Sequence, residues 1–322
     1  MERSVTLDPL DLQLLQALQL DGRAAFRRIA EVLEVSENTI ARRYRRLSAD
    51  GLRIVARTVP ERLGEATWLL RIQSTPDATA KLAEAIARLP ESSYVSIDSA
   101  DTQIHCGITT TAAAENGPPT ILANLKRTNR VTAISAHLLL RTYEGDPPSW
   151  YTKLDPLTPE QQAALTPEPP RPHLVEEPAA LDDTDRALLA RLASDARATL
   201  PELSAATDVS TATAKRRLDH LRANGILLIC TEFPHRRLGY RLMTYLWLRV
   251  EPARLEAVGL TLATHQPISF AAATTGPHNL VAATITRGTN DLYQYLTTQV
   301  GHLSGIQSIE TAPALHQLKR SG

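Results

Sequence analysis

The stretch Ser36–Gly51 places hydrogen-bonding side chains on one side of a predicted helix. At about 100° of rotation per residue, Ile40, Tyr44 and Leu47 fall in one apolar stripe, which predicts a buried back for that helix. The opposite side carries Asn38, Arg42, Arg45 and Arg46, and Arg43 lies on a flank. Arginine can donate to guanine edges or to phosphates, and asparagine can pair with adenine, so this front suits the major groove of DNA. A solvated basic face is the alternative interpretation while the helix is considered alone.

Two more amphipathic segments precede this helix and provide the scaffold that would position it. Pro9–Leu20 and Phe26–Leu33 both have apolar residues at helical spacing. Ser36 follows a short turn and is a favourable N-cap for the basic helix. Two short helices joined by a tight turn, with the second one basic and a third packed behind, are typical of a helix-turn-helix.

The same pattern returns in the second half of the chain. Ser210–Gly225 repeats Ser36–Gly51, with matching serine, threonine, arginine, leucine and glycine positions. The first helices also align, because LDPLDLQLLQAL begins at Leu7 and LDDTDRALLARL begins at Leu181. A basic helix that repeats together with its scaffold indicates a tandem duplication. The residues that we predict to bind DNA are Ser36, Asn38, Thr39, Arg42, Arg43, Arg45 and Arg46 in the first copy and Ser210, Thr211, Thr213, Lys215, Arg216 and Arg217 in the second.

The two predicted DNA-reading helices are unequal. In the second copy, the helical wheel buries Ala214, Leu218 and Leu221. The outward side then carries Ala212, Arg216, Asp219 and His220, and Lys215 and Arg217 lie nearer the flanks. An aspartate at that place repels phosphates unless it accepts a hydrogen bond from a cytosine amine. We therefore expect the first copy to supply most of the affinity for DNA.

Each helical copy is followed by a linking strand and then by a β-α-β-β-α-β pattern. In the first copy this pattern runs from Thr67 to Tyr143, and Gly117-Pro118-Pro119 must interrupt its second helix. The predicted fold is therefore α+β, with two winged or three-helix helix-turn-helix domains and two ferredoxin-like βαββαβ domains in tandem. The predicted segments are helix-turn-helix domains at 1–60 and 181–236, ferredoxin-like domains at 61–146 and 237–322, and a linker at 147–180.

The stretch Asp146–Ala180 separates the two copies and is rich in proline and acidic residues. Such a sequence is extended and semi-rigid, so a plain linker is the preferred interpretation. Thr158-Pro159-Glu160-Gln161 can nevertheless start one short helix, because it combines an N-cap, a first-turn proline and a capping-box glutamine. When extended, the linker spans roughly tens of ångströms, which lets the two sheet domains pair within one chain. We expect that pseudo-two-fold unit and, above it, a dimer of chains or a larger assembly.

The whole chain has no net charge, because 35 Lys and Arg residues balance 35 Asp and Glu residues. DNA affinity must therefore come from local patches. Cys106 and Cys230 occupy non-equivalent places, so neither a disulfide nor a metal site is predicted. No apolar run reaches the length of a membrane span, and no basic-then-apolar leader is visible. We expect a cytoplasmic protein with no cofactor, metal or membrane partner.

The order of these motifs resembles the Lrp/AsnC (leucine-responsive regulator) family of bacterial and archaeal transcription factors. The motifs that carry the resemblance are LDxxDxxLLxxL at Leu7 and Leu181, SxxTxxRRxxxL at Ser36 and Ser210, and the last strand Ile306–Lys319. The resemblance implies a transcriptional regulator that binds specific sequences of double-stranded DNA. It also implies a sheet domain that dimerises and often senses an amino acid. Family members usually carry one copy of each part, whereas this chain carries two.

The same resemblance places a candidate effector site at the turn between the second and third strands of each sheet domain. In the family this turn commonly holds a glycine followed by an acidic-aromatic pair. The second copy keeps Gly276 but has Asn279 where the acid is expected, and the first copy lacks the glycine and has Gln103 at that place. The candidate effector residues are Ala100, Asp101, Gln103, Gly276, His278 and Asn279. An amino acid and a different small molecule both stay open as the effector.

Tandem chains of this architecture also resemble the siroheme decarboxylases, enzymes whose two halves frame a tetrapyrrole. His278-Asn279-Leu280 is similar to their histidine- and asparagine-bearing strand. That function needs basic and histidine side chains lining a cleft, and the predicted strands carry few, so we do not expect an enzyme. His105-Cys106 is not predicted to be catalytic, because neighbouring residues of a strand point to opposite faces. A ligand-sensing partner protein that has lost DNA binding is the third alternative.

Overall fold

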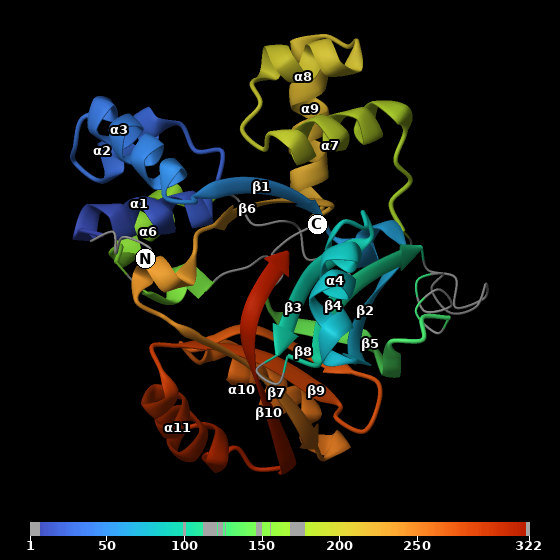
Figure 1. Ribbon diagram of the computed structural model, residues 1–322. Coiled ribbons are helices and arrows are strands. Elements are labelled where there is room, and N and C mark those ends of the chain that lie inside the picture. The colour runs from blue at the N-terminus through green and yellow to red at the C-terminus, as the bar shows by residue number, and fades with distance from the viewer. Residues whose placement is uncertain are drawn as a thin grey trace. The chain divides into compact units, whose positions relative to one another are not determined.

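The chain folds into two compact units, each built from both halves of the sequence. The computed structural model describes residues 7–98, 101–111, 121, 125, 127–145, 150–154, 156–167 and 178–319. One unit, called the head unit below, comprises Met1–Leu63 with Pro147–Gly239. The other, called the sheet unit, comprises Gly64–Asp146 with Tyr240–Gly322 (Figure 1). Ala100 and the predicted Gly117-Pro118-Pro119 interruption lie outside the described residues.

The first helical domain, head 1, contains three helices whose starts are fixed by side-chain caps and turns. The helices are α1 (Pro9–Leu20), α2 (Phe26–Val32) and α3 (Glu37–Ala49). Asp8 and Asp11 form a capping box at the start of α1, and Ser36 caps α3. Glu34 has a φ of 54°, a left-handed conformation that turns the chain between α2 and α3. The helix-turn-helix predicted from the sequence is therefore present in head 1.

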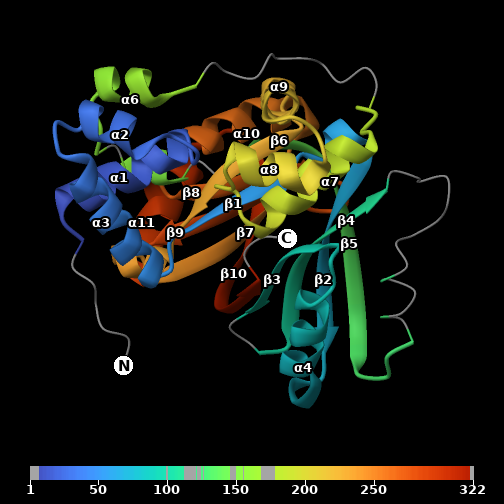
Figure 2. The same ribbon diagram turned by 90° about the horizontal axis from the view of Figure 1, so that it is seen from above.

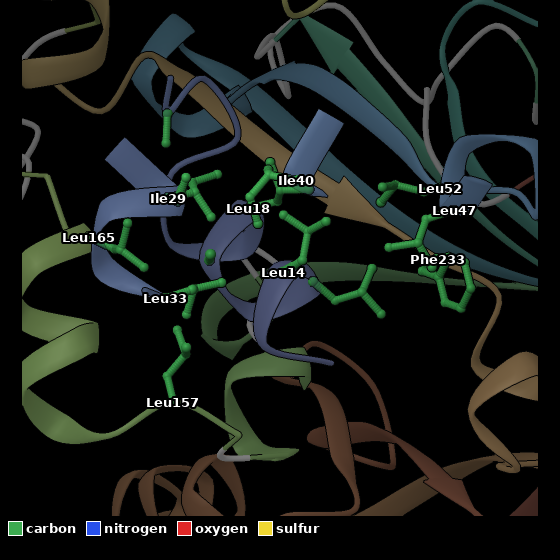
Figure 3. Packing of buried hydrophobic residues seen from close by; sticks show 14 residues of the cluster. Leu14, Leu18, Ile29, Leu33, Ile40, Leu47, Leu52, Leu157, Leu165 and Phe233 are labelled. Carbon is green, nitrogen blue, oxygen red and sulfur yellow. The ribbon is translucent and has the colours of Figure 1, made fainter. Parts of the chain in front are cut away.

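Apolar side chains from all three helices meet in one buried core (Figure 3). Leu14 and Leu18 of α1 pack with Ile29 of α2, and Ile40 and Leu47 of α3 are fully buried beside them. The two buried residues of α3 belong to the stripe predicted from its helical spacing. Their burial determines which side of α3 faces outward.

Part of the stretch between the two copies belongs to the core of head 1. Trp150–Leu154 forms a short 3-10 helix, and Pro159–Leu165 forms α6 with the capping box that its sequence predicts. Leu157 and Leu165 are 3% and 0% exposed and pack among the side chains of α1 and α2 (Figure 3). The Leu157 N–H also donates to Gln16 Oε1 at 2.8 Å. This stretch is therefore not the plain linker that its composition favours.

The second helical domain, head 2, repeats the three helices of head 1. They are α7 (Asp183–Ser194), α8 (Leu200–Thr207) and α9 (Thr211–Ala223). Asp208 has a φ of 53° and turns the chain between α8 and α9, as Glu34 does in head 1. Leu188, Leu203 and Leu218 form part of the separate core of this head.

The strands that follow α3 and α9, the two predicted DNA-reading helices, pair with each other. They are β1 (Arg53–Thr58) and β6 (Leu227–Glu232), followed by the short 3-10 helices η1 (Pro60–Leu63) and η4 (His235–Leu238). The two strands form an antiparallel ribbon in which Val55 lies opposite Cys230 (Figure 1). Head 1 and head 2 are therefore joined through a two-stranded sheet.

The sheet unit contains two copies of the βαββαβ pattern. The first copy comprises β2 (Glu65–Ser74), α4 (Pro76–Ala87), β3 (Ser92–Asp98), β4 (Gln103–Thr111) and β5 (Val131–Glu144). Ile121 and Leu125, between β4 and β5, are helical and buried. The second copy comprises β7 (Leu242–Val250), η5 (Pro252–Arg254), α10 (Leu255–Thr264), β8 (Ile268–Thr274), β9 (Leu280–Thr286), α11 (Thr289–Thr298), η6 (Val300–His302) and β10 (Ile306–Lys319). This is the predicted ferredoxin-like order.

The strands of both copies form one closed sheet, in the order β10-β3-β4-β2-β5-β8-β9-β7. The last strand of each copy pairs with the second strand of the other copy, because β5 pairs with β8 and β10 pairs with β3. The helix α4 packs on β3 and β4 (Figure 2). The two sheet domains therefore pair within one chain, as the length of the intervening stretch led us to expect.

Neighbouring residues of β4 lie on opposite faces of the sheet, as predicted. Cys106 is buried with Ile72 and Ala83 in the core beneath α4, and burial raises the pKa of its thiol to about 12. The His105 ring lies on the other face and stacks on Tyr245. The two side chains therefore cannot form a catalytic pair.

In the part of the chain that the structure describes, no helix has the length and apolar character needed to cross a membrane.

Candidate nucleic-acid interface

The outward side of α3 carries the side chains that were predicted to read bases. Asn38, Arg42 and Arg45 are exposed, on the side away from the buried Ile40. Arg42 makes no hydrogen bond or ion pair with any residue that the structure describes. The Arg45 Nε donates to the Ala41 carbonyl of its own helix at 3.3 Å. An exposed guanidinium without a protein partner can donate to a base edge or to a phosphate.

The predicted serine and threonine contacts fix the starts of the two reading helices. Ser36 Oγ accepts a hydrogen bond from the Thr39 N–H at 3.1 Å and lies 2.8 Å from Thr39 Oγ1. Ser210 and Thr213 repeat this arrangement at 3.2 and 3.0 Å. Thr211 is exposed at the first position of α9. These side chains therefore have a structural role, because each serine satisfies one backbone N–H group at the start of its helix.

The second arginine of the Arg42-Arg43 pair is bound within its own head. Arg43 Nη1 donates to Asp8 Oδ2 at 2.6 Å and to Asp11 Oδ1 at 2.7 Å. Arg46 also donates to Asp11, whose side chain is fully buried. These bonds connect α3 to the start of α1, and the name lock is used for them below. Arg46, which was predicted on the front, is exposed but bonded to Asp11, so Arg42 and Arg45 are the exposed arginines of α3 that make no ion pair with the described residues.

The lock shifts the protonation equilibria of its members. Burial opposes the ionisation of Asp8, but the hydrogen bonds from Arg43 and the Asp11 N–H outweigh it and lower the pKa of Asp8 below its usual 3.8. Burial alone would lower the pKa of Arg43. The hydrogen bonds to Asp8 and Asp11 have the larger combined effect, so the pKa of Arg43 is raised. Asp8 and Arg43 are therefore both charged at neutral pH.

Head 2 repeats the Arg43 part of the lock, and it has a matching exposed arginine. Arg217 Nη2 lies 2.6 Å from Asp182 Oδ2, and its Nη1 lies 3.2 Å from Asp185 Oδ2. The hydrogen bond from the Asp185 N–H, helped by Arg217, lowers the pKa of Asp182. Arg216 is exposed and makes no hydrogen bond or ion pair with the described residues. In both heads, the first arginine of the pair is free and the second is bound.

The rest of the head 2 front is less basic than that of head 1. Lys215 Nζ donates to Asp219 Oδ2 at 2.5 Å, one helical turn away. The His220 carbonyl accepts from Asn224 Nδ2 at 2.8 Å, and both residues lie at the end of α9. Because Asp219 neutralises Lys215, Arg216 is the remaining unpaired cation among Lys215, Arg216 and Arg217.

In the second sheet copy, the predicted effector turn is closed by bonds within the protein. Asn279 Nδ2 donates to the Val250 carbonyl, and Asn279 Oδ1 accepts from the Val250 N–H, both at 2.8 Å. Gly276 has a φ of 109°, and a Cβ there would lie 2.7 Å from His137 Nδ1. The side chain of Asn279 thus has a structural partner at both ends of its amide. His278 is half-buried, and its carbonyl accepts from Thr274.

In the first sheet copy, Asp101 is exposed with a φ of 53°, and Gln103 is buried. Gln103 Oε1 accepts from Arg71 Nη2 at 3.2 Å, and Arg71 also forms an ion pair with Glu310. The hydrogen bond from Arg71 is the largest influence on Glu310 and lowers its pKa, and the charge of His278 contributes. One residue of each predicted effector turn therefore interacts with the Arg71–Glu310 pair. Gln103 does so through its hydrogen bond with Arg71, and His278 does so through its charge, which acts on Glu310.

Two aromatic side chains inside the closed sheet have polar atoms without partners. Neither ring nitrogen of His105 has a hydrogen-bond partner among the described residues, and the same is true of Trp247 Nε1. Both residues are buried, and the His105 ring stacks on Tyr245 with centroids 4.5 Å apart. Burial, together with the charge of Arg71, lowers the pKa of His105 to about 3, so its ring is neutral at physiological pH. Such orphaned polar atoms are what a polar ligand could satisfy.

Several of these residues were not selected from the sequence. Arg71 could have been, because it is the one charged residue in the predicted strand TWLLRIQS. Glu310 gives a similar signal in the last strand. The partners Asp8 and Asp11 lie in the LDxxDxxLLxxL motif, whose repetition at Leu181 indicates the duplication but no role for its aspartates. The described residues contain no group of three or more His, Cys, Asp or Glu side chains that could hold a metal ion.

Comparison with known proteins assigns these features to a family. The AsnC-type helix-turn-helix domain matches residues 7–48 and 181–222, and the Lrp/AsnC ligand binding domain matches residues 244–322. The chain belongs to the Lrp/AsnC family of transcriptional regulators. The two matches to the helix-turn-helix domain show that the chain is a tandem duplication.

Two relatives in this family are each about half as long as this chain. The HTH-type transcriptional regulator FL11 of Pyrococcus abyssi is 25% identical over 142 residues, which is 44% of this chain and 93% of that protein. The HTH-type transcriptional regulator LrpA of Pyrococcus horikoshii is 25% identical over 140 residues, which is 43% of this chain and 99% of that protein. Each relative matches over nearly its whole length but over less than half of this chain, as expected for two copies in one chain.

The chain resembles solved structures of one enzyme over nearly its whole length. The siroheme decarboxylase NirDL, in complex with an iron-uroporphyrin III analogue, has a TM-score of 0.63 and 14% sequence identity. The match covers 98% of this chain and 93% of that chain. At this identity the likeness shows the fold alone, so side chains must decide between a regulator and an enzyme.

Proposed function

We propose that this Lrp/AsnC chain is a sequence-specific regulator that binds double-stranded DNA through both heads. The observation that carries the proposal is the contrast between Arg42 and Arg43. Arg43 is bonded to Asp8 and Asp11 behind the reading helix, whereas Arg42 is exposed in front of it without a partner. Base reading needs donors on an element that is itself held rigidly, and the lock provides that support.

A binding selection with genomic fragments, followed by mobility shifts at fixed salt, tests this proposal. We expect selected duplexes to bind far more tightly than random ones. Arg42→Ala should cost about 1–3 kcal/mol and relax the preference at one base position. Lys81→Ala, which removes an exposed charge from the sheet unit, is the matched control and should leave binding nearly unchanged. Equal binding to all sequences, unaffected by Arg42→Ala, would contradict the proposal.

Head 1 supplies most of the affinity in this proposal. Its front keeps Asn38 and two exposed arginines, whereas the front of head 2 has an aspartate that pairs with Lys215. Arg216→Ala should therefore cost clearly less than Arg42→Ala in the same mobility-shift assay. Equal losses on an operator with two identical half-sites would show that the heads are equivalent.

We also propose that any small-molecule effector of the sheet unit is bound weakly or with altered specificity. An amino acid needs partners for both its charges. Asn279 is bonded to Val250 through both ends of its amide, and Gln103 Oε1 is bonded to Arg71, so part of the hydrogen-bonding capacity of each amide is already used within the protein. In a thermal-shift screen of amino acids and related metabolites, we expect small shifts. A large stabilisation by leucine or a similar amino acid would refute this part of the proposal.

Association of whole chains forms the last part of the proposal. The strands β5 and β10 occupy matching places in the two copies, and each presents an exposed leucine: Leu140 is 59% exposed and Leu315 is 44% exposed. Ile309 and Leu318 of β10 are exposed as well, and exposed apolar side chains that recur along a strand favour contact with another surface. Light scattering during gel filtration should therefore give a mass of a dimer or more, and Leu140→Glu should lower it. A monomeric parent chain would contradict chain association.

A second candidate function, tetrapyrrole chemistry as in siroheme decarboxylase, is favoured by the histidines inside the closed sheet. His105 and His137 flank Trp247, and Arg71 lies over the same ring at 4.9 Å. The sheet therefore contains more basic groups near one another than its sequence suggested. Absorbance spectra of the protein mixed with siroheme test this function. A spectral shift that His105→Ala abolishes would favour the enzyme, and an unchanged spectrum would favour the regulator.

A further inference from the structure

The loops between the first two helices of each head are joined by a reciprocal pair of arginines. Arg23 of head 1 donates from Nη1 to the Ala196 carbonyl at 2.6 Å and from Nη2 to the Ala198 carbonyl at 2.7 Å. Those two residues flank Arg197 of head 2. Arg197 in turn donates to the carbonyls on both sides of Arg23, at 2.5 and 3.0 Å. Each guanidinium thus binds the backbone around the other, and the name clamp is used for this pair.

The clamp lies against the ribbon that joins the two heads. A Cβ on Gly22, next to Arg23, would lie 2.7 Å from Ile229 Cγ2 of β6 and 3.0 Å from Ile54 Cγ2 of β1. A larger residue at Gly22 would therefore displace the loop from the strands. The ribbon and the clamp therefore pack against each other, and together they are called the junction.

Both reading helices contact this junction directly. The guanidinium of Arg197 lies over the rings of Phe26 and Tyr44, with the Cζ 4.8 and 5.5 Å from their centroids, and Tyr44 belongs to α3. Arg222 of α9 donates from Nη2 to Asp21 Oδ1 at 2.9 Å, at the end of α1. A change in the junction would therefore be transmitted to α3 and to α9.

A planar guanidinium that makes two hydrogen bonds fixes distance and orientation together. Both clamp arginines are partly buried, and burial lowers the pKa of each. The positive charges of Arg222 and Arg197 lower the pKa of Arg23 further. Asp21 and Asp195 oppose that effect, and an arginine remains protonated in a protein. All four carbonyl bonds are therefore made by charged donors.

We infer that the clamp fixes the separation and orientation of α3 and α9, so that one chain reads two unlike half-sites at a single spacing. The DNA part of this inference rests on the proposed function, whereas the rigidity of the head unit does not. A two-stranded ribbon alone is a weak constraint, and two joined domains move relative to each other by default. Two reading helices related by a two-fold axis require one half-site separation, and unlike fronts require unlike half-sites.

Distances between spin labels test the rigidity without DNA. Ala49→Cys and Ala223→Cys place labels at exposed, matching positions near the ends of α3 and α9 in the full chain. The native Cys106 and Cys230 are 1% and 0% exposed, and the parent chain without new cysteines controls for their labelling. Double electron–electron resonance should give one narrow distance distribution. The Arg23→Ala, Arg197→Ala double variant should widen that distribution by about twofold or more, and an unchanged width would overturn the inference.

Loss of folding in the alanine variant is controlled by a lysine variant. Arg23→Lys with Arg197→Lys keeps both charges but removes the planar fork, so each side chain loses its paired bonds. We expect a native circular dichroism spectrum and a widened distribution. A width equal to that of the parent chain would again overturn the inference, because charge alone would then suffice.

A spacing series tests the consequence for DNA. The selected duplex is rebuilt with its half-sites moved apart by single base pairs, and each affinity is divided by that of a single half-site for the same variant. In the parent chain the ratio should fall by about tenfold or more at about five base pairs, half a helical turn, because both heads can no longer bind together. In the lysine variant it should fall less than about threefold. Equal spacing profiles for the two proteins would overturn the inference. A parent chain that binds no duplex would refute the proposed function and leave the spin-label result to decide the rigidity.

Discussion

At the scale of residues, the two arginines of each Arg-Arg pair have different roles. Arg42 and Arg216 are exposed and unpaired among the described residues, whereas Arg43 and Arg217 are bonded to aspartates at the start of the first helix. Neighbouring positions on a helix are separated by about 100°, so one can face outward while the next faces the scaffold. The same dipeptide therefore supplies a candidate base contact and its support.

Substitution of each member of the first pair separates these roles. Arg43→Ala leaves the fully buried Asp11 with Arg46 as its one remaining ion-pair partner, so it should lower the unfolding free energy by about 2–3 kcal/mol. Arg42→Ala removes an exposed side chain and should change that free energy by less than about 0.5 kcal/mol while weakening DNA binding. Urea unfolding and mobility shifts on both variants are the measurement. A large loss of stability in Arg42→Ala alone would show that the roles are reversed.

Low pH should weaken the locks. Asp8 and Asp182 have a lower pKa in the folded chain than the usual 3.8, so the unfolded chain takes up protons first as the pH falls. The stability that each lock contributes is therefore fully present above pH 3.8 and is lost as the pH falls through the folded pKa. Unfolding by urea should accordingly need less denaturant as the pH is lowered below that value. In Asp182→Asn this dependence should be smaller, and an equal dependence would show that Asp182 does not contribute.

The sequence alone predicted which residues of the reading helices face outward, but not what supports them. The spacing of Ile40 and Leu47 fixes the buried stripe, so the exposure of Asn38 and Arg42 follows from local periodicity. The bond between Arg43 and Asp11 joins two helices that are distant in the sequence. Only the packing angle of those helices brings the two charges together, and periodicity within one helix contains no such information.

At the scale of elements, the stretch between the copies contributes the helix α6 to head 1. The capping box of α6 was readable from Thr158 and Gln161, because a cap is local. Its docking was not, since α6 has only seven residues and composition favoured an extended chain. Gln16 accepts from the Leu157 N–H, whereas the matching position in head 2 is Ala190. A buried polar side chain in head 1 thus marks the place where the added helix packs.

Removal of the α6 anchor should destabilise head 1. Leu165 is fully buried, so Leu165→Ala should cost about 2–5 kcal/mol of unfolding free energy. Ala163→Ser, at an exposed position of the same helix, is the control and should cost less than about 0.5 kcal/mol. Chemical unfolding of both variants is the measurement. A midpoint for Leu165→Ala equal to that of the control would mean that α6 behaves as a plain linker.

At the scale of the whole molecule, duplication places two family copies in one chain. Tandem repetition was readable from the matching motifs, and pairing of the copies was expected because the intervening stretch is long enough. The pairing pattern itself was not readable, because β5 joins β8 and β10 joins β3 through backbone hydrogen bonds that any strand sequence can make. Arg23 and Arg197 also gave no local signal, since both bind carbonyl groups of the other head.

Cleavage between the copies should leave the molecule assembled. A protease site inserted between Pro167 and Pro178 would divide the chain into a first and a second copy. The fragments should remain together on gel filtration at micromolar concentration, because β1–β6, β5–β8 and β3–β10 each join strands from different fragments. The clamp adds charge-assisted hydrogen bonds between the same fragments. The uncut chain with the same insertion is the control for its elution volume. Fragments that elute separately would show that the covalent connection, rather than pairing of the copies, holds the molecule together.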